Sequence, residues 1–285
     1  MSYSWRKYQG TLLCDCEPHR EAPSKAEAIA ELRKSKAMFV RYTSDFDCGF
    51  PTEWWYCICD CFTPLDKLTA KQRYRVKKGL SRCNVEFLES DKQLTDSLFE
   101  EIYAVVVEAF SDYPLMYRPN ILKEDFRKEL LSRLTDKAQD VWLIKDAQDI
   151  KLIGYGYVTK KQTMVYLNQV KIPTKYLDTE ANAAFAYKIC EYYLNGQKYK
   201  YICDGERNIK HRTNYQEFLV RVLNFRYAYC RLNIFYSFPM KIAVNILYPF
   251  RNIIKHLGKH SAFLYNVYCV LKQENIHRNT QKAFR

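Results

Sequence analysis

The hydrophobic and polar positions of the chain follow two repeats. Runs rich in aromatic and β-branched residues predict strands, whereas apolar positions three and four residues apart predict helices. The centre of the chain, residues 82–236, gives a strand, two helices, three strands joined by short turns, a helix, a strand, a helix and a final strand. The predicted strands are 83–88, 141–145, 151–159, 163–172, 199–203 and 226–236, and the predicted helices are 95–110, 123–134, 181–194 and 213–223.

Residues 1–81 form an N-terminal extension to this central domain. A charged helix is predicted at 24–35. Two strand-like runs, 37–42 and 54–59, are separated by a connection that contains Gly and Pro, and this pattern predicts a hairpin. A short basic helix is then predicted at 65–80.

The basic helix carries a candidate anion site. Arg73, Lys77 and Lys78 fall on neighbouring turns, so their side chains come together on one surface. We expect this patch to bind a phosphate of the substrate, on a carrier lipid, a nucleotide or tRNA. The alternative is a solvated helix face, which is the usual fate of such a run.

The last segment, 237–285, is predicted to be a basic helical extension. Its most apolar stretch is interrupted by Lys241, Arg251 and Lys255, and it is shorter than the ~20 apolar residues of a membrane-spanning helix. The pattern is typical of an amphipathic basic helix, which either packs on the protein core or lies on an anionic membrane surface. We therefore expect no membrane-spanning segment and leave peripheral membrane contact open.

Positive charge is concentrated in the last third of the chain. The net charge is +13 over 285 residues, yet residues 1–199 contribute only +2 and residues 200–285 contribute +11. Such a block favours an anionic partner, which could be nucleic acid, a phosphorylated lipid or sugar, or a membrane surface. The alternative is a basic surface without a ligand. The chain is 48% apolar with few Gly and Pro, so we expect a compact fold rather than a disordered one.

Eleven cysteines raise the question of disulfides or metal. The first twenty residues contain no apolar run typical of a secretory signal, so we expect a cytoplasmic protein with reduced thiols. Cys57, Cys59 and Cys61 alternate along one strand-like run, and the two-residue spacing of zinc sites is absent. Buried apolar thiols are therefore favoured, and no metal is expected.

The order of elements in residues 82–236 resembles the GNAT superfamily of acyl-CoA N-acyltransferases. The segments 141–146 and 150–158 are similar to its second and third strands, and Asn224-Phe225 is similar to the corner after its penultimate helix. The resemblance implies a mixed α/β fold and the transfer of an acyl group to an amine. It covers about half of the chain.

Two further segments resemble particular branches of this superfamily. The helix at 65–80 and the strand after it are similar to the Fem-type aminoacyl or peptidyl transferases. The runs 204–208, 211–214 and 225–229 are similar to GNAT-like proteins of bacterial surface-polysaccharide synthesis. These resemblances imply a donor of the CoA or tRNA type, and an acceptor amine on a sugar or peptide precursor.

The resemblance places a cofactor site after the fourth strand of the fold. It implies that Ile172, Thr179 and Ala181 lie where the superfamily binds the CoA diphosphate, through backbone N–H groups and a helix N-terminus. Here the usual glycine is replaced by Thr179, and Glu180 adds negative charge. The usual tyrosine general acid falls near Val220. Both departures weaken an ordinary acetyl-CoA function.

Candidate catalytic residues follow the predicted fifth strand of the fold, where its cleft opens. N-acyl transfer needs a base that accepts a proton from the attacking amine. Asp204, Glu206 and His211 are the candidates, because carboxylates and imidazole accept protons at this position. The alternatives are a solvated turn, in which the carboxylates cap backbone N–H groups, and a structural histidine.

Candidate substrate-binding residues lie in the same segment and on the third strand. Arg207 could bind a carboxylate or phosphate, or instead pair with a neighbouring acid. Asn214 and Arg226 complete the polar cluster. Tyr155 and Tyr157 alternate with glycines that would admit a ligand, although tyrosines on a half-buried sheet face are the favoured interpretation.

The sequence thus predicts an N-acyltransferase-like protein. An alternative is a degenerate, non-catalytic module of the same fold that binds an anionic partner such as nucleic acid or a phosphorylated carrier. The altered loop at 176–181 favours the alternative, whereas the polar cluster after the predicted strand at 199–203 favours the enzyme.

Overall fold

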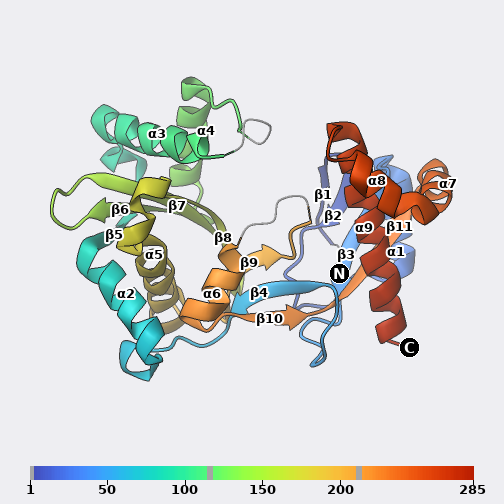
Figure 1. Cartoon of the computed structure of the whole chain (residues 1–285), viewed down its shortest axis with the longest axis horizontal. Coiled ribbons are helices and arrows are strands. Elements are labelled where there is room, and N and C mark those ends of the chain that lie inside the picture. The colour runs from blue at the N-terminus through green and yellow to red at the C-terminus, as the bar shows by residue number, and fades with distance from the viewer. Residues whose placement is uncertain (1–2, 114–117, 210–213) are drawn as a thin grey trace. The chain divides into compact units, whose positions relative to one another are not determined.

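The computed structural model describes residues 3–113, 118–209 and 214–285. It contains two compact units (Figure 1). The chain starts in unit 1, crosses to unit 2, and returns to unit 1 for its C-terminal part, with one short exchange between them. Unit 1 comprises Met1–Tyr56, Glu206–Thr213 and Tyr227–Arg285, and unit 2 comprises Cys57–Gly205 and Asn214–Arg226.

Unit 2 is built on a mixed sheet. The sheet has seven strands in the order β10-β4-β9-β8-β7-β6-β5. The strands β5 to β8 lie wholly in unit 2, whereas β4, β9 and β10 also contain residues of unit 1. The strands β5 to β8 pair antiparallel as a meander, and β9 pairs parallel with β8 after a helical crossover. The strands are β4 Trp55–Cys59, β5 Cys83–Leu88, β6 Gln139–Asp146, β7 Leu152–Lys160, β8 Met164–Lys171, β9 Tyr201–Glu206 and β10 Arg226–Tyr229.

Helices cover both faces of this sheet. In Figure 1, α3 and α4 lie on one side of the meander, and α2 and α5 lie on the other. The helix α2 begins with a capping box, in which Thr69 and Gln72 each accept a backbone hydrogen bond from the other residue. The helices are α2 Ala70–Arg82, α3 Asp96–Ser111, α4 Lys123–Thr135, α5 Ala181–Cys190 and α6 Tyr215–Leu223, with short helical turns η1 Leu65–Lys67, η2 Asp91–Gln93, η4 Thr174–Thr179 and η5 Glu191–Gly196.

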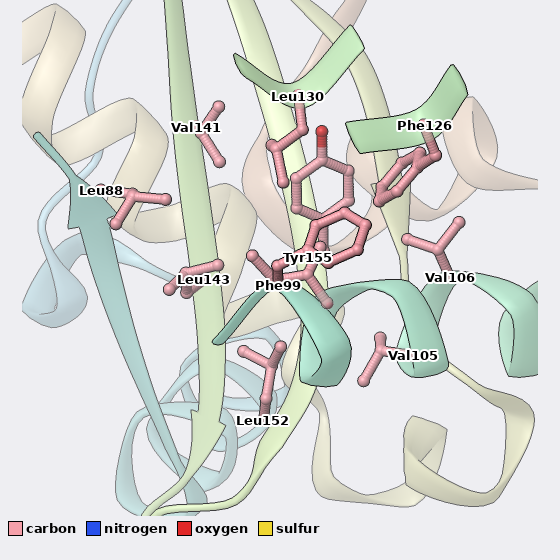
Figure 2. Packing of buried hydrophobic residues seen from close by; sticks show 11 residues of the cluster. Leu88, Phe99, Val105, Val106, Phe126, Leu130, Val141, Leu143, Leu152 and Tyr155 are labelled. Carbon is pink, nitrogen blue, oxygen red and sulfur yellow. The ribbon is translucent and has the colours of Figure 1, made fainter. Parts of the chain in front are cut away.

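The core on the α3–α4 side shows why the apolar pattern specifies this packing. Helix positions such as Ile102 and Val106 recur at four-residue spacing, and strand positions such as Val141 and Leu143 recur at two-residue spacing. Both sets point into one cluster (Figure 2). Its buried members are Leu88, Phe99, Ile102, Val105, Val106, Phe126, Leu130, Val141, Leu143, Leu152 and Tyr155.

Unit 1 has a smaller sheet of its own, in the order β1-β2-β3-β11. The strand β3 is central, pairing parallel with β2 and antiparallel with β11. The helix α1 connects β2 to β3, and the long α9 packs on β11. The elements are β1 Trp5–Tyr8, β2 Thr11–Cys14, α1 Lys25–Ser35, β3 Phe39–Ser44, β11 Arg231–Tyr236, α7 Phe238–Leu247, η6 Tyr248–Phe250, α8 Arg251–Leu257 and α9 Ala262–Ala283.

The observed order of elements confirms the predicted mixed α/β fold from β5 to α6. Two predictions at the ends of this domain are wrong. The strand-like runs at 37–42 and 54–59 do not form a hairpin with each other, because β3 and β4 belong to different sheets. The single strand predicted at 226–236 is two strands, since the chain leaves one sheet at Tyr229 and enters the other at Arg231.

Candidate active site of unit 2 and a pocket in unit 1

The strands β8 and β9 part at their carboxyl ends. Their parallel pairing runs from Met164↔Tyr201 to Tyr166↔Cys203, and the residue that follows the last pair is Asp204. The register of β8 against β7 also shifts at Asn168, which gives a bulge. Bulges are common beside active sites because they redirect side chains and end strand pairing. The resemblance predicts the cleft of the fold at this point of the sheet, and Asp204 is the first residue of β9 beyond the pairing.

Asp204 has an unusual electrostatic environment. Burial raises the pKa of its carboxyl from 3.8 to about 7, and a hydrogen bond from the Gln216 side chain opposes that shift. Gln216 lies in the first turn of α6 and also donates to the carbonyl oxygen of Gly205 at 3.4 Å. A carboxyl that titrates near pH 7 can accept or donate a proton at neutral pH. Asp204 is therefore a candidate for acid–base chemistry.

Tyr215 brings a second proton-bearing group to this region. Its hydroxyl oxygen is buried and has no hydrogen-bond partner in the described part of the chain. Burial raises the pKa of the phenol well above 10, and the charge of Asp204 raises it further. The ring stacks on Phe218 one turn along α6. A buried hydroxyl without a partner costs free energy, so it calls for an explanation such as a bound ligand.

Sequence reasoning missed Tyr215. The usual tyrosine was expected near Val220, in the middle of the predicted helix, whereas Tyr215 is the first residue of α6. The sequence does show that a tyrosine directly follows Asn214 near the start of a predicted helix. That signal does not say where the hydroxyl points. Asn214 itself is exposed, and its side chain makes no capping hydrogen bond.

The N-terminus of α5 is occupied by the protein itself. The backbone N–H of Ala181 donates to the Thr179 hydroxyl at 3.2 Å. Glu180, in the left-handed region with φ 63°, accepts two hydrogen bonds from Arg75 of α2, at 2.9 and 2.7 Å. A carboxylate therefore sits where the resemblance places the CoA diphosphate.

Close packing of α2 reinforces this arrangement. A Cβ built on Gly79 would lie 2.5 Å from the carbonyl oxygen of Glu180 and 3.0 Å from the backbone nitrogen of Ala184. Only glycine permits this approach. The residues at the start of α5 consequently do not fit a diphosphate, although Thr179 and Ala181 lie at the predicted position. Ile172 follows the end of β8 and packs near Gly154.

The predicted cationic patch on α2 is directed mainly to solvent. Lys77 is exposed, and Arg73 donates to the carbonyl oxygen of Asp66 at 3.3 Å. Lys78 is half-buried. The arginine of α2 that meets a partner across the fold is Arg75, which the patch did not include. Arg75 is four residues before Gly79, so it lies on the packed face of the helix.

The two tyrosines of β7 are part of the core side of the sheet. Tyr155 is fully buried, and its hydroxyl accepts a hydrogen bond from Arg133 at 2.9 Å. Tyr157 is half-buried under the same guanidinium, whose carbon lies 3.6 Å from the ring centroid. Arg226 forms an ion pair with Asp60 at 2.6 Å. These contacts satisfy all three side chains within unit 2.

The remaining predicted residues belong to unit 1. Glu206 and Arg207 follow Asp204 closely in sequence, but their side-chain partners lie in the smaller unit. Glu206 pairs with Arg41 of β3. Arg207 stacks on Trp55 and donates to the carbonyl oxygen of Glu53 at 2.6 Å. His211 lies outside the described residues.

Unit 1 contains a pocket of about 1000 Å³. Its walls are largely apolar and come from β3, α7 and α9. Arg41, Glu206, Arg207 and Asn208 give it one polar side. Apolar walls with a few convergent polar groups are typical of small-molecule sites. The apolar wall includes Met38, Phe39, Met240, Val244, Leu247, Val267, Val270 and Leu271.

Arg41 is held rigidly at the polar side of this pocket. It donates to Gln273 of α9 at 2.7 Å, pairs with Glu206, and lies 5.3 Å from the ring centroid of Trp54. The side chain is only 16% exposed. A guanidinium fixed in this way is preorganised to meet an anionic or polar ligand group. The sequence pattern does not predict this environment, because Arg41 is the one charged residue of a largely apolar strand.

Neither a metal centre nor a membrane span is evident among the described residues. No group of three or more His, Cys, Asp or Glu side chains there could hold a metal ion. The eleven cysteines are free thiols, seven of them buried. No helix in the described ranges combines the length and apolarity needed to cross a bilayer.

Comparisons with known proteins bear on the fold. No protein-family model matches the chain. No curated protein matches its sequence. Among solved structures, it is similar to the C-terminal domain of a putative lysylphosphatidylglycerol synthetase from Agrobacterium fabrum, with a TM-score of 0.55 and 11% identity over 86% of this chain and 85% of that chain.

Two further solved structures agree with this result. L-PGS from Bacillus licheniformis gives a TM-score of 0.50 at 12% identity, covering 85% of this chain and 83% of that chain. FemX gives 0.50 at 10% identity, covering 79% and 81%. At such low identity the likeness establishes the fold alone. The chain has the mixed α/β fold of these three structures, and the predicted resemblance to the Fem-type transferases is confirmed at the level of the fold.

Proposed function

We propose that this chain transfers an acyl or aminoacyl group to an amine, and that Asp204 is the general base. The observation that carries the proposal is a carboxyl with a pKa of about 7 at the point where β9 leaves β8. Perturbed carboxyls at the opening of a sheet are typical of acid–base sites. The fold, shared with FemX and a putative lysylphosphatidylglycerol synthetase, supports the reaction class.

In the proposed reaction, the acceptor amine attacks the carbonyl carbon of the donor. A C–N bond forms, and the ammonium proton passes to the Asp204 carboxylate. The bond to the leaving oxygen then breaks. The proton that this oxygen needs comes from the Tyr215 hydroxyl, which its raised pKa keeps protonated at neutral pH. Asp204 returns its proton to Tyr215, directly or through water, so that both groups are restored.

We favour an aminoacyl ester of the tRNA type as the donor. Glu180 and Arg75 occupy the N-terminus of α5, where a CoA donor would need to place its diphosphate, and the proposed reaction does not require CoA. The name of the Agrobacterium fabrum protein describes the joining of lysine to an anionic lipid, which supports an aminoacyl donor. The proposed acceptor is the amine of a sugar or peptide precursor, as the sequence resemblance implies.

The donor is tested by binding. Thermal stabilisation is measured with aminoacyl-tRNA, uncharged tRNA and 1 mM CoA, because a ligand that binds only the folded state raises Tm. We expect a shift with aminoacyl-tRNA and none with CoA. A shift with CoA alone would reverse the choice of donor while leaving Asp204 as the proposed base.

The base is tested by substitution of Asp204. With labelled aminoacyl-tRNA and an amino-sugar or peptide amine as acceptor, Asp204→Asn should lower the transfer rate at least 100-fold. The wild-type rate should fall as pH drops below about 7, where the carboxylate becomes protonated. Asp149→Asn, in the exposed turn before β7, is the matched control and should keep full activity. Transfer by Asp204→Asn at the wild-type rate would exclude Asp204 as the base.

The same substitution should also change how the free energy of unfolding depends on pH, which can be measured without knowing the substrate. The folded pKa of Asp204 is raised, so its stabilising contribution is complete below pH 4 and is lost as pH rises through 7. Asp204→Asn should therefore be more stable than wild type at pH 8, by about 2 kcal/mol after allowance for partial exposure, and equal to it near pH 4. Urea unfolding at the two pH values measures this difference. A constant difference would mean that the pKa is not raised.

A second candidate function is a non-catalytic module that binds an anionic partner. The ion pair of Arg75 with Glu180 at the N-terminus of α5 favours this function. A chain whose donor site is occupied by its own side chains could still bind a partner but would not catalyse transfer. The arginines of the unit 1 pocket offer an anion site. This function gains if tRNA or a phosphorylated carrier stabilises the protein, no transfer is detected, and Arg41→Ala removes the stabilisation while Asp204→Asn does not.

A further inference from the structure

The helices α7 and α8 expose an unusual amount of apolar side chain. Seven large apolar residues between positions 238 and 263 are 45% to 77% exposed. Where exposed apolar side chains gather on a protein, they commonly mark an interaction site. We call this set the α7–α8 apolar surface. It consists of Phe238, Ile242, Ile246, Phe250, Ile253, Leu257 and Phe263.

The exposed positions repeat at helical spacing. In α7, Phe238, Ile242 and Ile246 are four residues apart, so they lie along one side of the helix. The opposite side of α7 is apolar as well and is packed, with Val244 buried against α8 and α9. A helix that is apolar on both sides is normally covered on both. In α7 the residues that the structure describes cover only one side.

Charge around this surface has a single sign. The sequence contains no Asp or Glu between Glu217 and Glu274. Lys241, Lys255 and Lys259 are all exposed on α7, α8 and the turn after α8. Lysines beside an exposed apolar face match a bilayer with anionic headgroups, because the apolar side chains enter the headgroup boundary while the amines stay with the phosphates.

We propose that the α7–α8 apolar surface docks this protein on an anionic lipid bilayer. The helices have 10 and 7 residues, so they lie along the membrane surface rather than cross it. A second copy of the chain is a poorer occupant, since the segment that carries this surface has lysines but no Asp or Glu between Glu217 and Glu274 that could pair with them in a symmetric contact. The proposal is independent of the transfer reaction.

The test is flotation of the full chain with vesicles at 100 mM and 500 mM NaCl. Vesicles of phosphatidylcholine alone and of phosphatidylcholine with 30% phosphatidylglycerol are compared. We expect binding to the anionic vesicles, little to the neutral ones, and a loss at high salt. The double variant Ile246→Asn, Ile253→Asn should bind at least 10-fold more weakly. Equal binding by this variant and by wild type would overturn the proposal.

Matched control variants test whether vesicle binding depends on the α7–α8 apolar surface or on exposed apolar residues in general. Ile150→Asn and Leu122→Asn remove equally exposed apolar residues of unit 2, and they should leave vesicle binding unchanged. Lys255→Gln with Lys259→Gln should weaken binding to anionic vesicles, whereas Lys77→Gln on α2 should not. If the unit 2 controls lose binding as well, the α7–α8 apolar surface is not the docking site.

Two further arms distinguish other occupants. Light scattering of the lipid-free protein measures oligomeric state, and a dimer that the Ile246, Ile253 double variant dissociates would show that a second copy covers the surface. Short-chain phosphatidylglycerol below its critical micelle concentration tests the unit 1 pocket. If the monomeric lipid abolishes vesicle binding, the protein captures single lipid molecules in the pocket, and the surface proposal is overturned.

Discussion

The helix α2 and the α7–α8 segment are similar in sequence, but they differ in which of their faces are buried. Both are basic and helical, and both were candidates for anion binding. The helix α2 buries one face, formed by Gln72, Val76 and Gly79, and its charged side chains are exposed or half-buried around the rest of the helix. The α7–α8 segment buries one apolar face and leaves another exposed. The number of lysines does not predict this difference in packing, whereas the distribution of apolar positions around each helix does.

The largest effect expected from this comparison is on the packed face of α2. Gly79→Leu would force a side chain against the backbone of Glu180 and Ala184, so it should destabilise the protein by about 3 kcal/mol. Urea unfolding measures the change. Gly196→Ala is the matched control, because its Cβ would have no neighbour closer than 3.8 Å. Equal effects at the two glycines would mean that α2 is not closely packed there.

A smaller effect is expected at the ion pair between α2 and the start of α5. Both side chains are largely buried, so Arg75→Ala should leave the Glu180 carboxylate unpaired and cost about 2 kcal/mol. Arg75→Ala combined with Glu180→Gly should recover most of this loss, because it removes the unpaired charge and puts glycine at a positive φ. Additive losses in the double variant would show that the pair is not coupled.

The smallest effect on stability is expected on the outer side of α7. Ile246→Asn removes no buried contact, so the free energy of unfolding should change by less than about 0.5 kcal/mol. Val244→Asn, on the packed side of the same helix, should cost at least about 2 kcal/mol. The two variants are compared by thermal and urea unfolding. A large loss from Ile246→Asn would mean that the protein itself covers the outer side.

The fold was predictable from sequence where each element carries its own pattern. The meander β5 to β8 and the helices α3, α4 and α5 have apolar spacings that fix both their type and their buried face. The pairing of β3 with β11 was not predictable, because Phe39 and Tyr236 lie nearly two hundred residues apart and either strand pattern would suit several partners. From sequence alone, the strand that follows next along the chain is the simpler prediction for the partner of β3.

The candidate site was predictable only in part. Asp204 directly follows the strand predicted at 199–203, and the structure places it within β9, beyond the last pair with β8. Its raised pKa depends on burial, which the sequence does not state. Tyr215 and Arg75 matter because of the direction of their side chains, which tertiary packing decides. Glu206 and Arg207 were grouped with Asp204 by sequence distance, yet they contact unit 1. Proximity along the chain was therefore an unreliable guide at this boundary.

The division of unit 1 among three separate chain segments has a consequence for synthesis. The strand β3 is complete early, but its antiparallel partner β11 leaves the ribosome only after all of unit 2 has been made. Translation adds about 5–20 residues per second, so β3 waits on the order of ten seconds or more with one edge unpaired. During that interval an unpaired strand edge can pair with other strands of the chain or with other chains. Unit 1 should therefore be the part of the nascent chain that depends most on chaperones.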